Sequence, residues 1–240
     1  SISLLTSGTA PGHEPQTSAA WPAAVLFDLD GTLLDTAPDM IFALNAICRE
    51  EGSATVAYDR ARGFVSNGAV GLLRLAFPDF DPERNAGLHR RYLDRYAERL
   101  AVDTRLFPLL DTLLASLESA GVPWGVVTNK PRHLTEPLLE ALGLHERSAC
   151  TVSGDTLPER KPHPRPIQFA LERLGLAAEP GRSVYVGDAR RDIESGRAAG
   201  TRTIAVRYGY VEPGQDPATW GADYLVDTTR ELINLLREGR

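Results

Sequence analysis

The fold is decided by the stretch AAVLFDLDGTLLD, which spans residues 23–35. Its first five residues are all apolar and are followed at once by Asp28, a pattern typical of a short strand buried on both faces. Strands of this kind belong to parallel sheets that helices cover on both sides. The sequence therefore predicts a central parallel strand over 23–27, with a run of polar residues at its carboxyl end.

Apolar runs of strand length alternate with segments of helical periodicity along the rest of the chain. Four further strands are expected at 124–128, 183–186, 203–206 and, more weakly, 224–226. Helices are expected at 109–120, 134–142, 167–174, 193–199 and 232–236. Four of these helices are followed by glycines suited to a left-handed helix end, namely Gly121, Gly143, Gly175 and Gly200. This alternation predicts an α/β fold with a doubly wound parallel sheet, a Rossmann-like core.

One interval departs from the alternation, because no convincing strand pattern lies between Thr36 and Phe107. Helical faces are indicated there by two apolar series: Ile41, Leu44 and Ile47, and then Leu88, Tyr92, Tyr96 and Leu100. We therefore expect a small helical cap over 37–107, inserted into a core formed by 21–36 and 108–240. Residues 1–20, rich in Ser, Thr, Ala, Gly and Pro, are expected to be a disordered or added tail.

Composition narrows the classes of partner and compartment. The chain has 240 residues and a formal net charge of −6, without a dense basic block, which disfavours a nucleic-acid partner. No apolar stretch approaches the length of a membrane helix, and the first twenty residues lack the pattern of a signal peptide. Cys48 and Cys150 show no C-x-x-C spacing, so we expect reduced thiols and a cytoplasmic protein.

Polar residues follow three of the predicted strands at the point where each ends. In an open α/β sheet, ligands bind outside the carboxyl ends of the strands, so these residues should share one edge. In chain order they are Asp28, Asp30, Thr32, Thr128, Asn129, Asp188 and Asp192. Lys161 lies in a polar stretch before a helix, from which a loop could bring it to the same edge.

Such a set of residues suits phosphoryl transfer. Converging carboxylates repel one another unless a cation is present, and Mg²⁺ is a hard cation that prefers oxygen ligands. The Mg²⁺ and a lysine would neutralise the oxygens of a transferring phosphoryl group. One aspartate could then attack phosphorus, and a second could serve as proton donor and base. The alternative, a turn rich in Asp and Gly over 28–35, is disfavoured because Thr128, Lys161 and Asp188 follow in order.

The chain resembles the haloacid-dehalogenase-like hydrolases over residues 23–237. Their four motifs match, in order, Asp28-x-Asp30-Gly31-Thr32, Thr128, Lys161 and Gly187-Asp188-x-x-x-Asp192. The resemblance implies that Asp28 is the nucleophile that becomes phosphorylated and that Asp30 is the general acid and base. It further implies that the Asp28 carboxylate, the Asp30 backbone carbonyl and Asp188 hold Mg²⁺. The roles implied for the other three residues are a hydrogen bond from Thr128 to the phosphoryl group, charge neutralisation by Lys161, and orientation of Lys161 or a metal-bound water by Asp192.

The resemblance also implies a substrate class. Asp30 favours phosphoester hydrolysis over dehalogenation, because a departing alcohol oxygen needs a proton. The insertion resembles that of the small-cap members, which act on small phosphorylated metabolites, as monomers or homodimers. The segments WGVVTNKP (124–131) and RYGY (207–210) are similar to phosphoglycolate phosphatases, a group that includes N-acetylmuramic acid 6-phosphate phosphatases of peptidoglycan recycling.

Substrate contacts in the cap are harder to predict. The segment at residues 62–68 resembles the substrate-facing part of such caps, which makes Arg62 and Asn67 candidate contacts beside Thr128, Asn129 and Lys161. A plain loop between two cap helices remains an alternative for this segment. Arg190 and Arg191 are expected at the solvated start of a helix, and binding of a substrate carboxylate is the alternative for them.

Two other functions remain open. A phosphosugar mutase of the same fold would share every core residue and differ in its cap. A phospho-acceptor signalling domain also uses a strand-end Asp, a Thr, a Lys and Mg²⁺, but it needs neither Asp30 nor a helical insertion.

Overall fold

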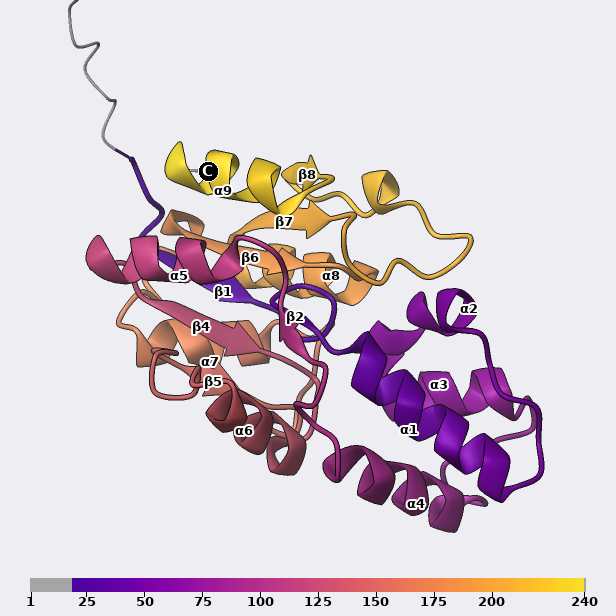
Figure 1. The fold of residues 1–240 in the computed structure, drawn as a ribbon. Coiled ribbons are helices and arrows are strands. Elements are labelled where there is room, and N and C mark those ends of the chain that lie inside the picture. The colour runs from indigo at the N-terminus through magenta and orange to yellow at the C-terminus, as the bar shows by residue number, and fades with distance from the viewer. Residues whose placement is uncertain (1–18, 240) are drawn as a thin grey trace, which may run out of the picture.

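The computed structural model describes residues 19–239 and centres on a six-stranded parallel sheet (Figure 1). The strand order is β5-β4-β1-β6-β7-β8, with β1 paired to both β4 and β6. The strands are β1 (Ala24–Phe27), β4 (Trp124–Val127), β5 (Thr151–Val152), β6 (Ser183–Gly187), β7 (Arg202–Val206) and β8 (Tyr224–Val226). The doubly wound parallel sheet predicted from the sequence is thereby confirmed.

The register of the central strands sets the position of the polar residues. Phe27 pairs with Val126 of β4 and with Val186 of β6, so the three strands end nearly level. Asp28, Thr128 and Asp188 follow these ends directly and so share one edge of the sheet.

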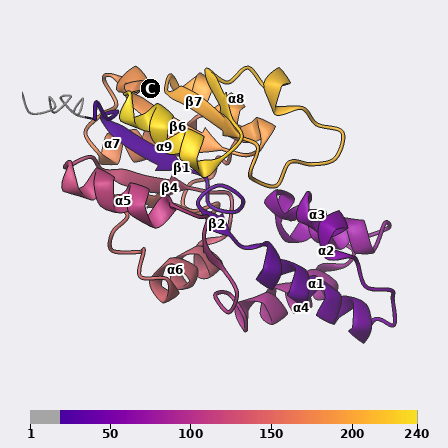
Figure 2. The ribbon, with the colours of Figure 1, turned by 45° about the horizontal axis from the view of Figure 1, so that its top comes forward.

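Helices cover both faces of the sheet (Figure 2). Val25 and Phe27 belong to an apolar cluster shared with α5 (Leu110–Ser119) and α9 (Thr229–Arg237), whereas Leu26 packs with α7 (Arg165–Arg173) on the opposite face. Alternate side chains of a strand point to opposite faces, so β1 is apolar throughout because both of its faces are buried. The remaining core helices are α6 (Arg132–Ala141) and α8 (Arg190–Ala199). Gly121, Gly143, Gly175 and Gly200 all have positive φ, as their places after helices predicted.

A group of helices lies beyond the carboxyl ends of the strands (Figures 1 and 2). It consists of α1 (Ala37–Glu50), α2 (Tyr58–Arg62), α3 (Gly68–Ala76) and α4 (Ala86–Ala97), with a 3₁₀ turn at Val65–Asn67. Ile41, Leu44 and Ile47 are buried along α1, and Tyr92 and Tyr96 are buried along α4. We call residues 37–107 the helical insertion, and that extent remains a proposal.

Three expectations need correction. A short strand does lie between Thr36 and Phe107, because β3 (Arg105–Leu106) pairs antiparallel with β2 (Leu34–Asp35) where the insertion leaves the core. The edge strand β5 was also missed. Both consist of two residues, which is too short for a periodic pattern. The helical series predicted to end at Leu100 is also too long, because α4 ends at Ala97 and Leu100 lies beyond it.

The structure also places part of the N-terminal flank and both cysteines. Most of the expected tail, residues 1–18, lies outside the described residues, whereas Ala20 donates a backbone hydrogen bond to Arg237 and is held at the core. Cys48 and Cys150 are free thiols. No helix in the described part of the chain is long and apolar enough to cross a membrane.

Candidate active site

A buried lysine joins the carboxylates at the strand ends. Lys161 is only 4% exposed, and its Nζ lies 2.9 Å from Asp28 Oδ1 and 2.7 Å from Asp192 Oδ1. It also donates to the Tyr185 hydroxyl at 2.7 Å. A buried ammonium group is stable only when it is paired with negative charges and hydrogen-bonded, and the two carboxylates and the hydroxyl meet this requirement. The loop before α7 therefore does bring Lys161 to the edge where Asp28 lies.

Asn129 fixes the position of that loop. Its side-chain oxygen accepts a hydrogen bond from the Lys161 backbone N–H at 3.0 Å, and its amide donates to the Lys161 carbonyl at 2.9 Å. Both ends of the Asn129 amide thus hold the main chain of Lys161. Asn129, predicted as a substrate contact, also lines the pocket described below, so the structure gives it a positioning task in addition.

Three buried aspartates near the strand ends lie close enough to repel one another, and a cation bound between them would relieve this repulsion. Oxygens of Asp28, Asp188 and Asp192 lie within 4.8 Å of one another, and all three residues are buried. Burial raises the pKa of Asp28 well above its ordinary value, and the charge of Asp192 adds to this effect. The same two causes raise the pKa of Asp188. Burial opposes the charge on Lys161, but Asp192 and Asp28 outweigh it and raise the lysine pKa.

The oxygen donors fit a hard divalent cation such as Mg²⁺. Asp28 and Asp188 offer carboxylate oxygens whose mutual repulsion a cation would relieve. Asp192 differs from Asp188 in its partners: its Oδ1 accepts from the charged Lys161 and its Oδ2 accepts from the Ala189 N–H at 3.1 Å, whereas within residues 19–239 both Asp188 oxygens accept only from neutral donors. The position of Asp192 therefore suits the orienting task expected for it.

Gly31 allows the first strand end to approach Asp188. It has φ +83°, and a Cβ at this position would lie 2.1 Å from Asp188 Oδ2. Next to it, the Thr32 hydroxyl donates to Asp188 Oδ1 at 3.2 Å. The sequence Asp30-Gly31-Thr32 thus positions the carboxylate that follows β6.

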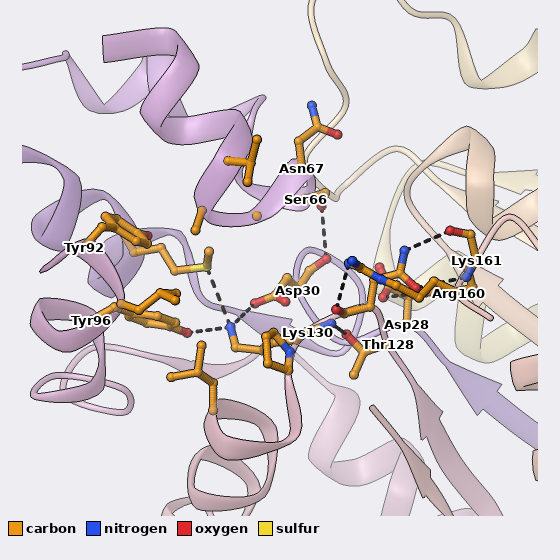
Figure 3. A pocket seen from close by; sticks show the side chains of 18 of the residues that line it. Asp28, Asp30, Ser66, Asn67, Tyr92, Tyr96, Thr128, Lys130, Arg160 and Lys161 are labelled. Carbon is orange, nitrogen blue, oxygen red and sulfur yellow. Dashed lines mark hydrogen bonds and ion pairs between the residues drawn. The ribbon is translucent and has the colours of Figure 1, made fainter. Parts of the chain in front are cut away.

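A second buried lysine, Lys130, was not assigned from the sequence. Its Nζ lies 2.9 Å from Asp30 Oδ1 and donates to the Tyr96 hydroxyl at 2.6 Å (Figure 3). Asp30 Oδ1 also accepts a hydrogen bond from the Thr36 hydroxyl at 2.6 Å. Lys130 therefore connects a core carboxylate to helix α4 of the insertion. The available signal was a lysine directly after Thr128 and Asn129 at a strand end.

These residues open into a pocket of about 360 Å³ between core and insertion. Figure 3 shows Asp28, Thr128 and Lys161 on one side of it and Tyr92 and Tyr96 on the other. A site enclosed in this way admits small ligands and limits the access of water.

Only part of the insertion segment 62–68 lines the pocket. Arg62 is absent from the lining; its guanidinium donates to the carbonyls of Tyr208 and Gly209, both at 3.1 Å. These hydrogen bonds connect the insertion to the core, and a substrate contact for Arg62 remains a prediction. Asn67 does line the pocket. Ser66 was overlooked, although its hydroxyl lies 2.6 Å from Asp188 Oδ2 and 3.1 Å from the Asp30 carbonyl.

Arg190 and Arg191 differ in their surroundings. Arg190 is exposed, as expected at a solvated helix start. Arg191 instead lines the pocket, where it donates to Asn67 Oδ1 at 3.2 Å and to the Ser66 carbonyl. The expectation of a solvated side chain was wrong for Arg191, because the insertion covers this end of α8.

We expect Lys130→Met to lower kcat/KM by about 10–100-fold, because Asp30 loses a charge-assisted hydrogen bond that fixes its carboxyl group. The matched variant Tyr96→Phe removes only a neutral partner of Lys130 and should cost less than about tenfold. Steady-state phosphate release and thermal melting would be measured for both variants. An equal loss in the two would show that the phenol, and not the lysine, organises Asp30.

Comparison with known proteins agrees with this geometry. Residues 25–206 match the haloacid dehalogenase-like hydrolase family. The chain is 47% identical over 219 residues to an N-acetylmuramic acid 6-phosphate phosphatase of Pseudomonas aeruginosa, covering 89% of this chain and 94% of that protein. It is 44% identical over 212 residues to a phosphoglycolate phosphatase of Xanthomonas campestris, covering 88% and 95%.

A solved structure shows the same fold. A protein of Haemophilus somnus, described as a predicted phosphoglycolate phosphatase, superposes with a TM-score of 0.79 and 26% identity. The match covers 89% of this chain and 97% of that one. Family match, relatives and fold agree with the motif residues gathered at the strand ends. The chain therefore belongs to the haloacid dehalogenase-like hydrolase family, and within it to the phosphoric monoester hydrolases.

Proposed function

We propose that the protein is a Mg²⁺-dependent phosphatase that hydrolyses a small phosphorylated metabolite through an aspartyl-phosphate on Asp28. The proposed substrates are N-acetylmuramic acid 6-phosphate and 2-phosphoglycolate, the compounds for which relatives are named. The observation that carries the proposal is the buried Asp28 carboxyl group, which faces the pocket with Lys161 Nζ at 2.9 Å and Asp188 beside it.

The first half-reaction uses Asp28 and Asp30. A carboxylate oxygen of Asp28 attacks phosphorus, the bond from phosphorus to the alcohol oxygen breaks, and Asp30 gives its proton to that oxygen. Lys161 and Thr128 stabilise the charge that spreads over the phosphoryl oxygens. Because burial raises the pKa of Asp28, its attack as a carboxylate depends on the positive charge held beside it.

The second half-reaction reverses the task of Asp30. It takes a proton from water as the water oxygen attacks phosphorus, the bond between Asp28 and phosphorus breaks, and inorganic phosphate leaves. Among residues 19–239, both hydrogen bonds to the Asp30 carboxyl group fall on Oδ1. We therefore assign the transferred proton to Oδ2.

Asp28, Asp188 and the Asp30 carbonyl are the proposed holders of Mg²⁺. When bound, the ion supplies Lewis-acid stabilisation of the phosphoryl oxygens and balances the repulsion between Asp28 and Asp188. The proposed cap, residues 37–107, limits the site to small substrates by closing the pocket with α4 and the 3₁₀ turn. A cytoplasmic location remains a prediction.

The test is phosphate release from the two proposed substrates, measured side by side with Mg²⁺ and with EDTA. We expect hydrolysis of at least one substrate, a fall of more than about 100-fold on chelation, and recovery when Mg²⁺ is restored. A higher kcat/KM for the sugar phosphate would favour peptidoglycan recycling, and a higher value for 2-phosphoglycolate would favour metabolite repair. Undiminished hydrolysis in EDTA would refute the metal dependence, and no hydrolysis of either compound would refute the substrate assignment.

A further inference from the structure

The pocket is lined by four Lys and Arg side chains, and two of them form direct ion pairs with carboxylates. Lys161 pairs with Asp28 and Asp192, and Lys130 pairs with Asp30. The other two, Arg160 and Arg191, also line the pocket. Within the described residues, neither guanidinium forms a direct ion pair with a carboxylate. Burial opposes the charge on Arg191, but Asp192, Asp28 and Asp188 lie close enough to it to raise its pKa.

The hydrogen bonds of these two arginines go to uncharged oxygens. Arg160 donates to the Asn129 carbonyl at 3.2 Å, and Arg191 donates to Asn67 Oδ1 and to the Ser66 carbonyl. A guanidinium carries five N–H donors, so one or two such bonds leave others free. Arg191 is partly buried, and the nearby charges of Asp192, Asp28 and Asp188 stabilise its guanidinium without a direct ion pair. An anionic ligand in the pocket can therefore use the N–H donors that remain free.

The transferring phosphoryl group already has its own partners. Lys161 and Thr128 face the nucleophile Asp28, and the proposed Mg²⁺ adds to them. The two arginines come from other elements, Arg160 from the loop before α7 and Arg191 from the start of α8. They therefore provide charge beyond what the phosphoryl group requires.

We propose that Arg191, assisted by Arg160, binds a carboxylate that the substrate carries in addition to its phosphate. The inference rests on the proposed function, because both proposed substrates are carboxylic acids: one carries a lactyl ether and the other is a glycolate. The planar guanidinium matches a carboxylate through two parallel hydrogen bonds, which gives both affinity and orientation. Because Ser66 and Asn67 hold Arg191 in place, the insertion helps to form this subsite.

The test compares each proposed substrate with an analogue that lacks the carboxylate. N-acetylmuramic acid 6-phosphate is paired with N-acetylglucosamine 6-phosphate, which lacks the lactyl group, and 2-phosphoglycolate is paired with 2-hydroxyethyl phosphate. For the pair that the wild-type enzyme hydrolyses, we expect a preference for the acid of at least tenfold in kcat/KM. Arg191→Gln should reduce that ratio by about tenfold, and Arg160→Gln by less, because Arg160 is exposed.

Two further variants make the comparison specific. Arg190→Gln alters the exposed neighbour on the same helix and should leave the ratio as in the wild type. Arg191→Lys keeps the charge without the planar fork and should recover only part of the preference. All variants would be compared by thermal melting, but a purely structural defect lowers both substrates of a pair equally and leaves their ratio unchanged.

The possible failures are distinguishable. Equal losses on both members of a pair in Arg191→Gln, or a wild-type enzyme indifferent to the carboxylate, would overturn the inference and leave the phosphatase intact. A higher kcat/KM for a sugar bisphosphate than for the acid would also overturn it, by assigning the arginines to a second phosphate. Failure of the wild-type enzyme to hydrolyse any of these compounds would refute the proposed function, and this inference with it.

Discussion

Asp28→Asn is expected to lower phosphate release by about 10⁴-fold or more, since an amide oxygen cannot form the phosphorylated intermediate. The substitution keeps the shape of the side chain, so Lys161 can still donate to the oxygen of the new amide. It removes one negative charge from a cluster in which burial raises the pKa of Asp28. We therefore expect the thermal stability of the metal-free variant to equal or exceed that of the wild type.

The measurement should separate chemistry from folding. Phosphate release would be followed in single-turnover and steady-state experiments, with mass spectrometry to detect a phosphoryl group attached to the wild-type chain. Asp94→Asn is a matched control, because Asp94 is an exposed aspartate on α4 outside the pocket lining. A variant at Asp28 that still turned over within about tenfold of the wild type would mean that another residue attacks phosphorus.

The sequence could predict those site residues that directly follow a buried strand, and it predicted less well those that other parts of the fold position. Asp28, Thr128 and Asp188 follow buried strands, and the levels of parallel strand ends follow from sheet topology alone. An apolar run of four or five residues is enough to locate such a strand. The two-residue strands β2, β3 and β5 offer no comparable signal.

Contacts between insertion and core could not be predicted in the same way. Ser66 and Arg191 meet only because the insertion folds back over the start of α8, and no periodicity in either segment encodes that approach. For the same reason the sequence could not predict that Arg62, in the same segment as Ser66, donates to the carbonyls of Tyr208 and Gly209. A helical pattern predicts which face of a helix is buried, but not which partner buries it.

Asp30→Asn should lower kcat/KM by about 10²–10⁴-fold for a substrate with an ordinary alcohol leaving group, which is the range that general acid catalysis contributes. For p-nitrophenyl phosphate the loss should be less than about tenfold, because p-nitrophenolate departs without a proton. The comparison must use kcat/KM, which reports the step in which the leaving group departs. The value of kcat also includes hydrolysis of the aspartyl-phosphate, where Asp30 acts as a base for either substrate.

A change at Thr36 separates proton transfer from orientation. Thr36→Val removes the 2.6 Å hydrogen bond to Asp30 Oδ1 and leaves the carboxyl group able to carry its proton. Its losses should therefore be similar for the two leaving groups, whereas those of Asp30→Asn should differ by at least tenfold. If Asp30→Asn instead slowed both substrates equally, the contribution of the Asp30 side chain would lie in its charge and in its hydrogen bonds with Lys130 and Thr36. The proton for the departing oxygen would then have to come from water.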